Sequence, residues 1–563
     1  MHNKKTERIF TPVHNIKEYL ETVRTHGDKT LFRWLESNEY TSNTYTQFSD
    51  KVIAIANGLA KNGLAGKSIA VIGETCVEWI AAYLAVLATG GVIVPMDKEL
   101  DITAIEGFLE TANAEAIVHG KTFNQKLAHL PKTHPTIKYL IPMDKEMECS
   151  DGILPLHAIE QRGSEDIDSF TVSERDVNEL AVMLFTSGTT GTSKCVMLCE
   201  KNIWSTVNSA CSTVEFFKED TIVSVLPLHH TYELACMLSG MLYGMEIGIN
   251  DSLRHIMKNF AEFKPTGLIL VPLFINTMYN KIIDKAKKTG KYKKMKMGIA
   301  ISNFLRHFGI DIRRKLFKDV IDAFGGRLVK IVSGGAPLNP EMVKQFDSFG
   351  ITISEGYGIT ECSPLVSVNP YFALKSGSVG PAVPSCQVRI DSKGKNSKGF
   401  DEGEIQVKGD NVMLGYYNND EENAKAFTSD GWYCTGDVGY MDNDGYIFIT
   451  GRLKSVIVLE NGKNVFPEEI EEYLENIEEV GEVVVVGRKA EDGETIKLTA
   501  IVYPSVDIYG ETPDVDKAYN DINVRIKEFN RKAASFKQIK ALEIRTTPFE
   551  KTTTRKIKRH LVK

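Results

Sequence analysis

The alternation of helix and strand patterns near the start of the chain limits the possible folds more than any other feature. Segments with helical periodicity alternate with apolar runs of strand length, at 46–64, 67–73, 77–89, 91–95, 103–112 and 116–119. Such alternation is typical of right-handed βαβ units, which build a mostly parallel sheet with helices on both faces. The sequence therefore predicts an α/β fold whose large N-terminal domain contains doubly wound parallel sheets, with ligands at the carboxyl ends of the strands.

The pattern of helix and strand signals changes at about Arg452, which predicts a second and smaller domain. A Glu-rich helical segment opened by proline is followed by apolar runs of strand length, at 467–479, 483–486, 498–503 and 541–545. A unit of roughly a hundred residues is within the usual range for a domain. We therefore expect an N-terminal domain over 1–451 and a C-terminal α+β domain over 452–563.

A polar loop between two apolar runs has the composition of a polyphosphate-binding site. Its residues are Thr186, Ser187, Gly188, Thr189, Thr190, Gly191, Thr192, Ser193 and Lys194. Glycines allow backbone N–H groups to turn toward an anion, hydroxyls donate further hydrogen bonds, and the lysine supplies positive charge. Both flanks have strand character, so we expect a hairpin loop rather than the GxxxxGK[ST] loop that opens a helix. A turn of this composition that binds no ligand is the alternative.

This loop resembles the phosphate-binding signature of the AMP-forming adenylating superfamily, which includes acyl- and aryl-CoA synthetases, nonribosomal peptide adenylation domains and firefly luciferase. Further matches follow in the family's order, at Ser333 to Pro337, Glu355 to Glu361, Tyr433 to Asp437, Gly451 to Lys454 and Lys551 to Lys556. The resemblance covers nearly the whole chain. It implies formation of an acyl-adenylate from ATP, and a small C-terminal domain that rotates between two half-reactions.

The resemblance also assigns residues to parts of the nucleotide. It assigns binding of the β- and γ-phosphates of ATP to Thr186, Ser187, Gly188, Thr189, Thr190, Gly191 and Lys194. The resemblance assigns the ledge beside adenine to Gly334, Gly335, Ala336 and Pro337. It assigns the segment whose tyrosine stacks on the base to Glu355, Gly356, Tyr357 and Gly358. The ribose contacts fall to Asp437, held on the turn Thr435-Gly436, and to Arg452.

Four further residues are expected to take part in catalysis or in domain rotation. Thr360 matches the family's contact to the α-phosphate, and Glu361 offers a hard carboxylate oxygen for Mg²⁺. Without the resemblance, this pair could be a capped helix start. Lys556 occupies the place of the catalytic lysine, and Lys454 occupies that of the hinge.

The last segment departs from the family pattern at one position. Arg555 stands where the family has a glycine before Lys556, so Arg555 or Lys558 could share the work of the catalytic lysine. Without the other motifs, a run this basic near a chain end would be interpreted as a solvated tail.

One segment resembles the border of the acyl channel in long-chain fatty acyl-CoA synthetases. Leu226 to Glu233 carries His230 at the family's histidine, although a buried structural histidine is the alternative. The stretch 271–274 and the long insert before Phe324 also resemble the long-chain group. The apolar residues of 237–243 could line a channel or belong to the ordinary core.

Composition excludes several other classes of protein. The net charge of −7 argues against a dedicated nucleic-acid binder, so no nucleic acid is expected as a partner. Nine scattered cysteines without a CxxC pair support neither a disulfide framework nor a zinc site. No apolar leader or run of membrane-spanning length is found, and we expect a cytoplasmic location.

The insert 281–320 is strongly basic within this acidic chain. It holds 13 Lys and Arg residues against 3 Asp residues. Such a patch is most often a solvated helical face, but it could also contact the phosphates of CoA or bring the protein weakly to an anionic membrane surface.

Together with these features, the resemblance implies an AMP-forming acyl-CoA ligase that uses ATP, Mg²⁺ and CoA on a medium- to long-chain fatty acid. A close alternative is an acyl-AMP ligase or acyl-acyl carrier protein synthetase, which passes the acyl group to protein-bound phosphopantetheine. An alternative of another class is a catalytically silent nucleotide-binding regulator. The presence of Lys194, Glu361, Asp437 and Lys556 argues against the regulator.

Overall fold

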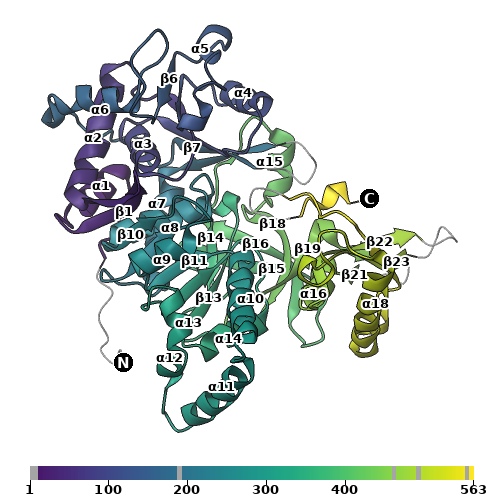
Figure 1. Cartoon of the computed structure of the whole chain (residues 1–563). Helices are drawn as coiled ribbons and strands as arrows, with labels where there is room; N and C mark the ends of the chain where they lie inside the picture. The colour runs from purple at the N-terminus through teal and green to yellow at the C-terminus, as the bar shows by residue number, and fades with distance from the viewer. Residues whose placement is uncertain (1–9, 187–192, 460–463, 490–495, 552–556, 563) are drawn as a thin grey trace. The chain divides into compact units, whose positions relative to one another are not determined.

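The computed structural model describes residues 10–186, 193–459, 464–489, 496–551 and 557–562 (Figure 1). The chain divides into two compact units. Unit 1 comprises Met1–Val388 and Val407–Tyr433, and unit 2 comprises Arg389–Gln406 and Cys434–Lys563.

Unit 1 contains a seven-stranded sheet with the strand order β17-β8-β7-β4-β3-β5-β6. Its strands are β3 (Ser68–Ile72), β4 (Val92–Met96), β5 (Ala116–His119), β6 (Tyr139–Pro142), β7 (Leu180–Thr186), β8 (Lys194–Cys199) and β17 (Gly415–Tyr416). The strands from β7 to β6 are parallel, whereas β8 turns back antiparallel to β7 and β17 is antiparallel to β8. The predicted alternation is confirmed, because α2 (Tyr45–Lys61), α3 (Val77–Ala88) and α4 (Ile102–Thr111) precede β3, β4 and β5.

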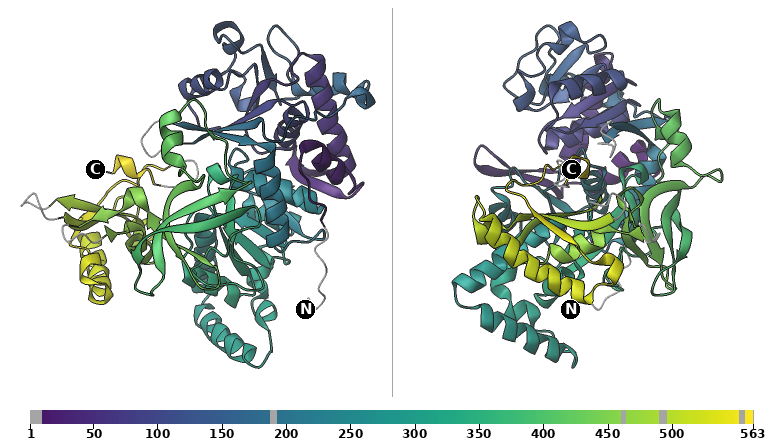
Figure 2. Two further views of the ribbon diagram at one scale, coloured as in Figure 1. Left: turned by 180° about the vertical axis from the view of Figure 1, so that it is seen from behind. Right: turned by 90° about the vertical axis from the view of Figure 1, so that its right-hand side faces the viewer.

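A second, eight-stranded sheet of unit 1 has the order β14-β13-β12-β11-β9-β10-β1-β2. Its strands are β1 (Thr30–Glu36), β2 (Glu39–Thr44), β9 (Thr221–Ser224), β10 (Glu246–Ile249), β11 (Gly267–Leu270), β12 (Lys330–Ser333), β13 (Thr352–Gly358) and β14 (Leu365–Val368). Neighbouring strands are parallel except at the two edges, where β2 and β14 pair antiparallel. Figures 1 and 2 show helices covering these sheets.

Helices complete the layers of unit 1. They are α1 (Ile16–Arg24), α5 (Leu130–Thr133), α6 (Leu156–Ser164), α7 (Glu200–Thr213), α8 (Thr231–Tyr243), α9 (Ile256–Phe263), α10 (Pro272–Lys288), α11 (Tyr292–Arg306), α12 (Arg313–Leu316), α13 (Lys318–Ala323), α14 (Pro340–Ser348) and α15 (Asp420–Ala426). None of the described helices is long and apolar enough to cross a membrane.

The sequence of each helix explains where it begins and what it buries. α2 begins at a capping box, in which the Thr44 hydroxyl accepts from the Gln47 N–H and the Gln47 side chain accepts from the Thr44 N–H. α3 is apolar on nearly every side, and a helix of that kind must lie inside the protein. Its Trp79 and Tyr83 are fully buried and stack with a ring distance of 5.8 Å. Each such side chain contributes about 1.5–3 kcal/mol of burial energy.

Among its described residues, unit 2 is an α+β unit with two larger sheets and a two-stranded one. A four-stranded sheet joins β15 (Cys386–Lys395), β16 (Asp401–Gly409), β18 (Tyr433–Met441) and β19 (Ile447–Arg452), and a three-stranded sheet joins β22 (Val480–Lys489), β23 (Ile496–Pro504) and β24 (Ala541–Ile544). A short hairpin of β20 (Ile457–Val458) and β21 (Asn464–Val465) lies between them in sequence, followed by α16 (Pro467–Leu474), α17 (Val506–Tyr509) and α18 (Val515–Lys532). The core of the C-terminal part is formed by Val465, Ile470, Leu474, Val483, Val485, Leu498, Ala500, Val502, Ala518, Ile522 and Ile526.

One helix boundary differs from the sequence-based expectation. The predicted helix over 468–479 ends at Leu474, because Asn476 donates to the Glu472 carbonyl and the chain turns at Ile477 into β22. The four-stranded sheet belongs by compactness to unit 2, since its strands pair with one another, although it lies within the predicted domain 1–451. The predicted boundary at Gly451/Arg452 is the point about which the C-terminal domain would rotate, and it stays a prediction.

Candidate active site

The predicted phosphate loop is closed by a β-hairpin. Thr186 and Lys194 are the last register pair of β7 and β8, and the Thr186 hydroxyl donates to the Lys194 carbonyl at 3.4 Å. The two ends of the loop are therefore held together, as a hairpin requires. The predicted contacts Ser187, Gly188, Thr189, Thr190 and Gly191 lie outside the described residues.

The Lys194 ammonium is held at the base of this hairpin by two groups from distant parts of unit 1. It forms an ion pair with Glu422 of α15, and it lies over the ring of Tyr416, 4.6 Å from the centroid. Tyr416 reaches this place because β17 pairs with β8. An ammonium held between an aromatic face and a carboxylate keeps its charge in a fixed position. A phosphate that approached Lys194 would compete with Glu422 for it.

The same tyrosine connects the lysine to the predicted metal ligand. The Tyr416 hydroxyl donates to Glu361 Oε1 at 2.8 Å, and the Met413 N–H donates to the Glu361 carbonyl at 2.8 Å. Burial and the negative charge of Glu361 raise the pKa of Tyr416 well above its usual value, so the phenol keeps its proton and remains a donor. The Tyr433 hydroxyl lies 3.5 Å from that of Tyr416. Lys194, Tyr416 and Glu361 thus form one polar cluster.

The segment before Glu361 requires glycine at Gly358. A Cβ there would lie 2.5 Å from the Pro364 carbonyl oxygen. Thr360 begins a single 3₁₀ turn, Thr360–Cys362, which carries Thr360 and Glu361 directly after β13. Tyr357, the predicted adenine-stacking residue, is buried and only 7% exposed.

The two motifs predicted to contact adenine lie side by side at the carboxyl ends of β12 and β13. Ser333 and Glu355 are register partners in these parallel strands, so 334–337 and 355–358 leave the same edge of the sheet. A Cβ on Gly334 would lie 3.0 Å from the ring of Tyr232, whose hydroxyl donates to the Val332 carbonyl at 3.1 Å. Gly335 has a φ of +84°, which favours glycine. Gly335, Ala336 and Pro337 are exposed and form an open ledge.

His230 is placed at the start of α8, as its N-cap residue. Its ring lies 4.0 Å from that of His229, whose Nε2 is 3.5 Å from Asp97 Oδ2. Glu233, in the first turn of α8, is 2% exposed and accepts a hydrogen bond from the Ser224 hydroxyl. Burial raises the pKa of Glu233 to about 8, so this carboxyl is mostly protonated at neutral pH.

A small apolar cavity lies between α8 and the seven-stranded sheet. Its volume is about 20 Å³, and its lining includes Val182, Leu184, Leu198, Leu234 and Leu238. A cavity of this size holds about one water molecule. An acyl tail would therefore need these side chains to move apart. Of the predicted lining residues 237–243, Leu238 borders the cavity, and the apolar members are otherwise buried in the core.

In unit 2, Asp437 and Arg452 face each other as register partners of β18 and β19. Arg452 Nε lies 2.8 Å from Asp437 Oδ1, and the Asp437 side chain is 4% exposed. The turn is rigid, because the Asp437 N–H donates to the Thr435 hydroxyl at 3.0 Å and that hydroxyl donates to the Ile405 carbonyl at 2.7 Å. A carboxylate fixed in this way can accept hydrogen bonds with little loss of entropy.

Lys454 and the segment predicted to carry the catalytic lysine also belong to unit 2. Lys454 is exposed on the 3₁₀ turn Leu453–Ser455 that follows β19. Lys556 and Arg555 lie outside the described residues. The chain is anchored on both sides of them, because Lys551 pairs with Glu482 at 2.6 Å and Arg559 pairs with the buried Glu471.

The predicted metal ligand, Glu361, lies among the described residues. Among them, no three His, Cys, Asp or Glu side chains gather closely enough to hold a metal ion. Mg²⁺ commonly binds through one or two carboxylates together with substrate phosphates and water. Glu361 is partly exposed beside the hairpin and fits that role.

Two residues of this cluster could not be recognised in the sequence. Tyr416 lies in a strand of two residues, which is too short to show any periodicity. Glu422 lies in the first turn of α15, where acidic residues are common because they interact favourably with the helix dipole. Tyr433 was part of a recognised motif, but no role was predicted for it. The pairing of β17 with β8 reveals the position of Tyr416, and the ion pair with Lys194 reveals that of Glu422.

Comparison with known proteins places this arrangement in context. Residues 20–417 match the family model of the AMP-binding enzyme, and residues 454–563 match that of the AMP-binding enzyme C-terminal domain. The long-chain-fatty-acid–CoA ligase FadD15 of Mycobacterium bovis is 27% identical over 584 residues, covering 96% of this chain and 94% of that protein. The peroxisomal long chain acyl-CoA synthetase 7 of Arabidopsis thaliana is 29% identical, covering 87% of this chain and 72% of that protein.

Solved structures share the fold. ATP-bound MatB from Rhodopseudomonas palustris superposes with a TM-score of 0.74 at 24% identity, covering 96% of this chain and 98% of that one. The adenylation domain of a carboxylate reductase from Mycobacterium chelonae superposes with a TM-score of 0.80 at 20% identity, covering 100% and 90%. At these identities the likeness concerns the fold alone.

Proposed function

The chain belongs to the AMP-binding enzyme family, and on that premise we propose that it is an ATP-dependent, AMP-forming acyl-CoA ligase for medium- to long-chain fatty acids. In the first half-reaction a fatty acid and ATP give an acyl-adenylate and pyrophosphate. In the second, the thiol of CoA takes the acyl group and AMP leaves. The names of the curated relatives support fatty acids as the substrate class.

The cluster of Lys194, Tyr416 and Glu361 is the observation that carries this proposal. A cation and a carboxylate, bridged by a phenol, lie beside a hairpin rich in glycine and hydroxyl groups. A polyphosphate with its magnesium ion needs this combination, because the cation neutralises phosphate oxygens and the carboxylate binds the metal.

The first half-reaction then has residues to perform it. A carboxylate oxygen of the acid attacks the α-phosphorus, and the bond to pyrophosphate breaks. Lys194 and the hairpin residues 186–191 stabilise the departing pyrophosphate, while Thr360 contacts the α-phosphate. Glu361 would hold Mg²⁺, which supplies charge neutralisation between the phosphates when bound. Lys556 neutralises the charge that develops between the acid and the α-phosphate.

The remaining assignments concern recognition. Asp437, fixed by its turn and by Arg452, accepts hydrogen bonds from the ribose hydroxyls. The ledge 334–337 and the segment 355–358 contact adenine, with Tyr357 as the aromatic partner of the base. His230 borders the acid. Lys454 is the pivot about which residues 452–563 change orientation between the half-reactions.

A single screen tests the function and separates its alternatives. Pyrophosphate release is measured with Mg-ATP over straight-chain, branched and aromatic acids, with and without free CoA. We expect the highest kcat/KM for a straight chain of medium or long length, and an acyl-CoA product with CoA. Acyl-adenylate that is released, or transferred only to a phosphopantetheinylated carrier protein, would identify the acyl-AMP ligase or acyl-carrier synthetase. Nucleotide binding without turnover would identify a silent regulator.

A further inference from the structure

An exposed apolar stripe runs along α11. Met297, Ile301 and Phe304 occupy positions i, i+4 and i+7 of this helix, and Phe308 follows at i+11 in the turn after it, so all four project from one side. These side chains are 60%, 48%, 63% and 68% exposed, respectively. The rings of Phe304 and Phe308 contact each other edge to face, with centroids 5.3 Å apart. Exposed apolar residues normally occur singly, so a contiguous stripe of four indicates an interaction surface.

The other side of α11 is the one that packs into unit 1. Ser302 is fully buried, and a Cβ on Gly298 would lie 3.1 Å from Leu316 Cδ2. Small residues let this side approach α12 closely. The stripe therefore contributes little to the core, and its outward orientation is fixed by the fold.

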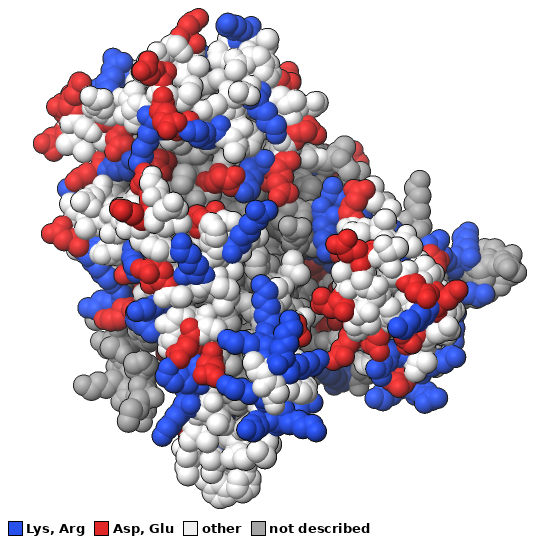
Figure 3. Space-filling model, in the orientation of Figure 1, with Lys and Arg blue, Asp and Glu red and all other residues white. Residues whose placement is uncertain are grey.

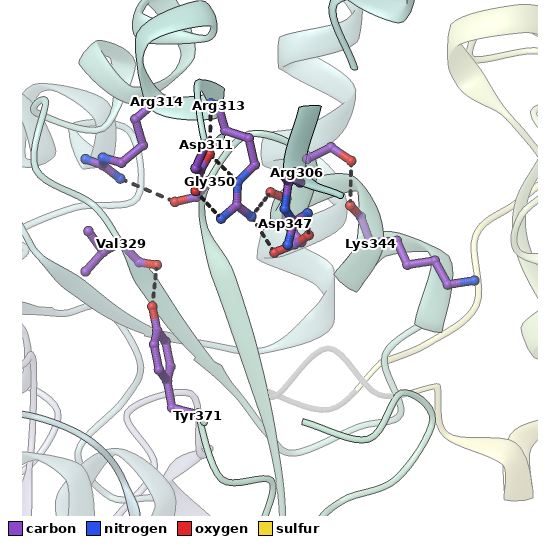
Figure 4. A network of polar contacts seen from close by, with 10 residues as sticks. Arg306, Asp311, Arg313, Arg314, Val329, Lys344, Asp347, Gly350 and Tyr371 are labelled. Atoms are coloured by element: carbon purple, nitrogen blue, oxygen red, sulfur yellow. Dashed lines mark hydrogen bonds and ion pairs between the residues drawn. The ribbon is translucent and has the colours of Figure 1, made fainter. Parts of the chain in front are cut away.

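A network of ion pairs anchors the end of α11 (Figure 4). Arg306 Nη1 lies 2.6 Å from Asp347 Oδ2, and Arg313 Nη1 lies 2.7 Å from Asp347 Oδ1. Arg313 also binds Asp311 at 2.7 Å, and its hydrogen bonds lower the pKa of Asp311 to about 2. Because Asp347 belongs to α14, the turn that carries Phe308 is tied to the body of unit 1. The stripe is presented on a rigid support.

Basic residues surround the start of the stripe. They are Lys285, Lys287 and Lys288 in the last turn of α10, and Lys293, Lys294 and Lys296 in the first turns of α11. Figure 3 shows Lys and Arg side chains gathered over α10 and α11, beside an uncharged tip. Lys293 and Lys294 have no carboxylate within ion-pair distance among the described residues. Figures 1 and 2 show α11 standing out from the sheets of this unit.

We propose that α10 and α11 dock the protein on the surface of an anionic lipid bilayer. Met297, Ile301, Phe304 and Phe308 enter the boundary between headgroups and acyl chains, and the lysines of 285–296 contact lipid phosphates. A helix with aromatic residues on one side and lysines beside them is suited to this position. Each lysine close to an anionic membrane strengthens binding about fivefold before screening by salt.

The charge of the insert favours a bilayer over a second copy of the chain. A symmetric contact through α11 would bring two basic surfaces together, each with an excess of 10 positive charges over 281–320 (13 Lys and Arg against 3 Asp). Like charges placed opposite each other oppose association. An anionic surface complements both the lysines and the stripe.

Vesicle binding of the full chain, without substrates, tests the proposal independently of the ligase activity. Sedimentation is compared between phosphatidylcholine vesicles and vesicles with 30% phosphatidylglycerol, at roughly 0.1 M and 0.5 M salt, which differ in screening length. The stripe variant is Phe304→Ser with Phe308→Ser, and its control is Phe372→Ser, a 76% exposed phenylalanine outside α11. The charge variant is Lys293→Glu with Lys294→Glu, and its control is Lys527→Glu with Lys532→Glu on α18, which changes the net charge equally.

We expect binding to anionic vesicles that weakens at high salt, and a loss of about tenfold or more for each α11 variant relative to its control. In a Phe304→Trp variant, lipids brominated on their acyl chains should quench the added emission, even if the serine variant folds poorly. Equal binding to both kinds of vesicle, equal losses in the controls, or an unquenched tryptophan would overturn the proposal. A dimer in solution that the stripe variant dissociates, with unchanged vesicle binding, would identify a second copy as the occupant instead.

Discussion

Tyr416 donates a 2.8 Å hydrogen bond to the carboxylate of Glu361 while its ring lies under the ammonium of Lys194. One side chain thus positions both the proposed metal ligand and the proposed phosphate-binding cation. Because the Tyr416 proton is retained, the hydroxyl can orient Glu361 throughout the reaction.

Tyr416→Phe removes this hydrogen bond and keeps the ring under Lys194. A hydrogen bond to a charged group contributes about 1.5–3 kcal/mol, so we expect kcat/KM for Mg-ATP to fall roughly 10- to 100-fold. The concentration of Mg²⁺ that gives half-maximal rate should rise. Tyr417→Phe is the matched control and should retain the wild-type rate. An unchanged Mg²⁺ requirement in Tyr416→Phe would contradict the positioning of Glu361 by this hydroxyl.

Glu422→Gln tests the competition for Lys194. The ion pair with Lys194 lowers the pKa of Glu422, so the carboxylate is charged at neutral pH and would have to release the lysine for the proposed phosphate contact. Loss of that charge should lower the KM for ATP severalfold with little effect on kcat. Glu421→Gln on the same helix is the control, since Glu421 pairs with Lys425 instead. A higher KM in Glu422→Gln would show that Glu422 supports ATP binding.

Glu233 predicts a pH dependence of stability. Its folded-state pKa of about 8 lies above the ordinary value of 4.5, so the native state binds this proton more tightly than the unfolded chain. The stability that this contributes is present below pH 4.5 and is lost as the pH rises through 8. Glu233→Gln resembles the protonated form, and the free energy of unfolding of the wild type should fall relative to this variant by up to about 4 kcal/mol between pH 5 and 8.

Denaturant unfolding of both proteins at several pH values measures this difference. Glu110→Gln on α4, an exposed glutamate, should follow the wild type at every pH. Parallel pH profiles for wild type and Glu233→Gln would show that Glu233 is already ionised in the folded protein.

Lys556→Ala and Lys454→Pro should separate the two half-reactions. Without Lys556, adenylation should slow by several orders of magnitude, since a preorganised charge at the transition state contributes about 3 kcal/mol or more. Thioester formation from prepared acyl-adenylate and CoA should persist. Lys454→Pro should do the reverse, because proline fixes φ at the position where the chain must turn. Equal losses in both half-reactions of a folded Lys556→Ala protein, or intact adenylation, would assign the charge to Arg555 or Lys558 and remove the argument for a rotating domain.

Local patterns predicted much of the fold because periodicity and burial agree there. The segment 77–89 forms α3, and the apolar runs around the phosphate loop form β7 and β8, as expected. The end of α16 depends on the side-chain hydrogen bond of Asn476 and the turn at Ile477. The grouping of β15 and β16 with unit 2 depends on pairing between strands that are distant in sequence, and the local patterns predicted neither.

Residues of the candidate site were predictable where they belong to a motif that is contiguous in sequence. They were not predictable where the fold brings together residues from distant segments. Lys194 and Glu361 were recognised from their motifs, and the structure brings both to Tyr416. Tyr416 and Glu422 carry no local signal, since their positions arise from the pairing of β17 with β8 and from the ion pair across unit 1. The exposure of Phe304 and Phe308 likewise required the structure, because the sequence showed only the basic charge of the insert.

Transfer of oxygen between substrates tests the central claim most directly. The protein is incubated with Mg-ATP, CoA and a long-chain fatty acid labelled with ¹⁸O in both carboxyl oxygens. Mass spectrometry then measures the ¹⁸O content of each product. If the acid attacks the α-phosphorus and CoA then displaces AMP, one ¹⁸O atom appears in AMP and the other remains in the thioester. Unlabelled AMP, or label in phosphate released alongside ADP, would contradict an acyl-adenylate pathway in this protein.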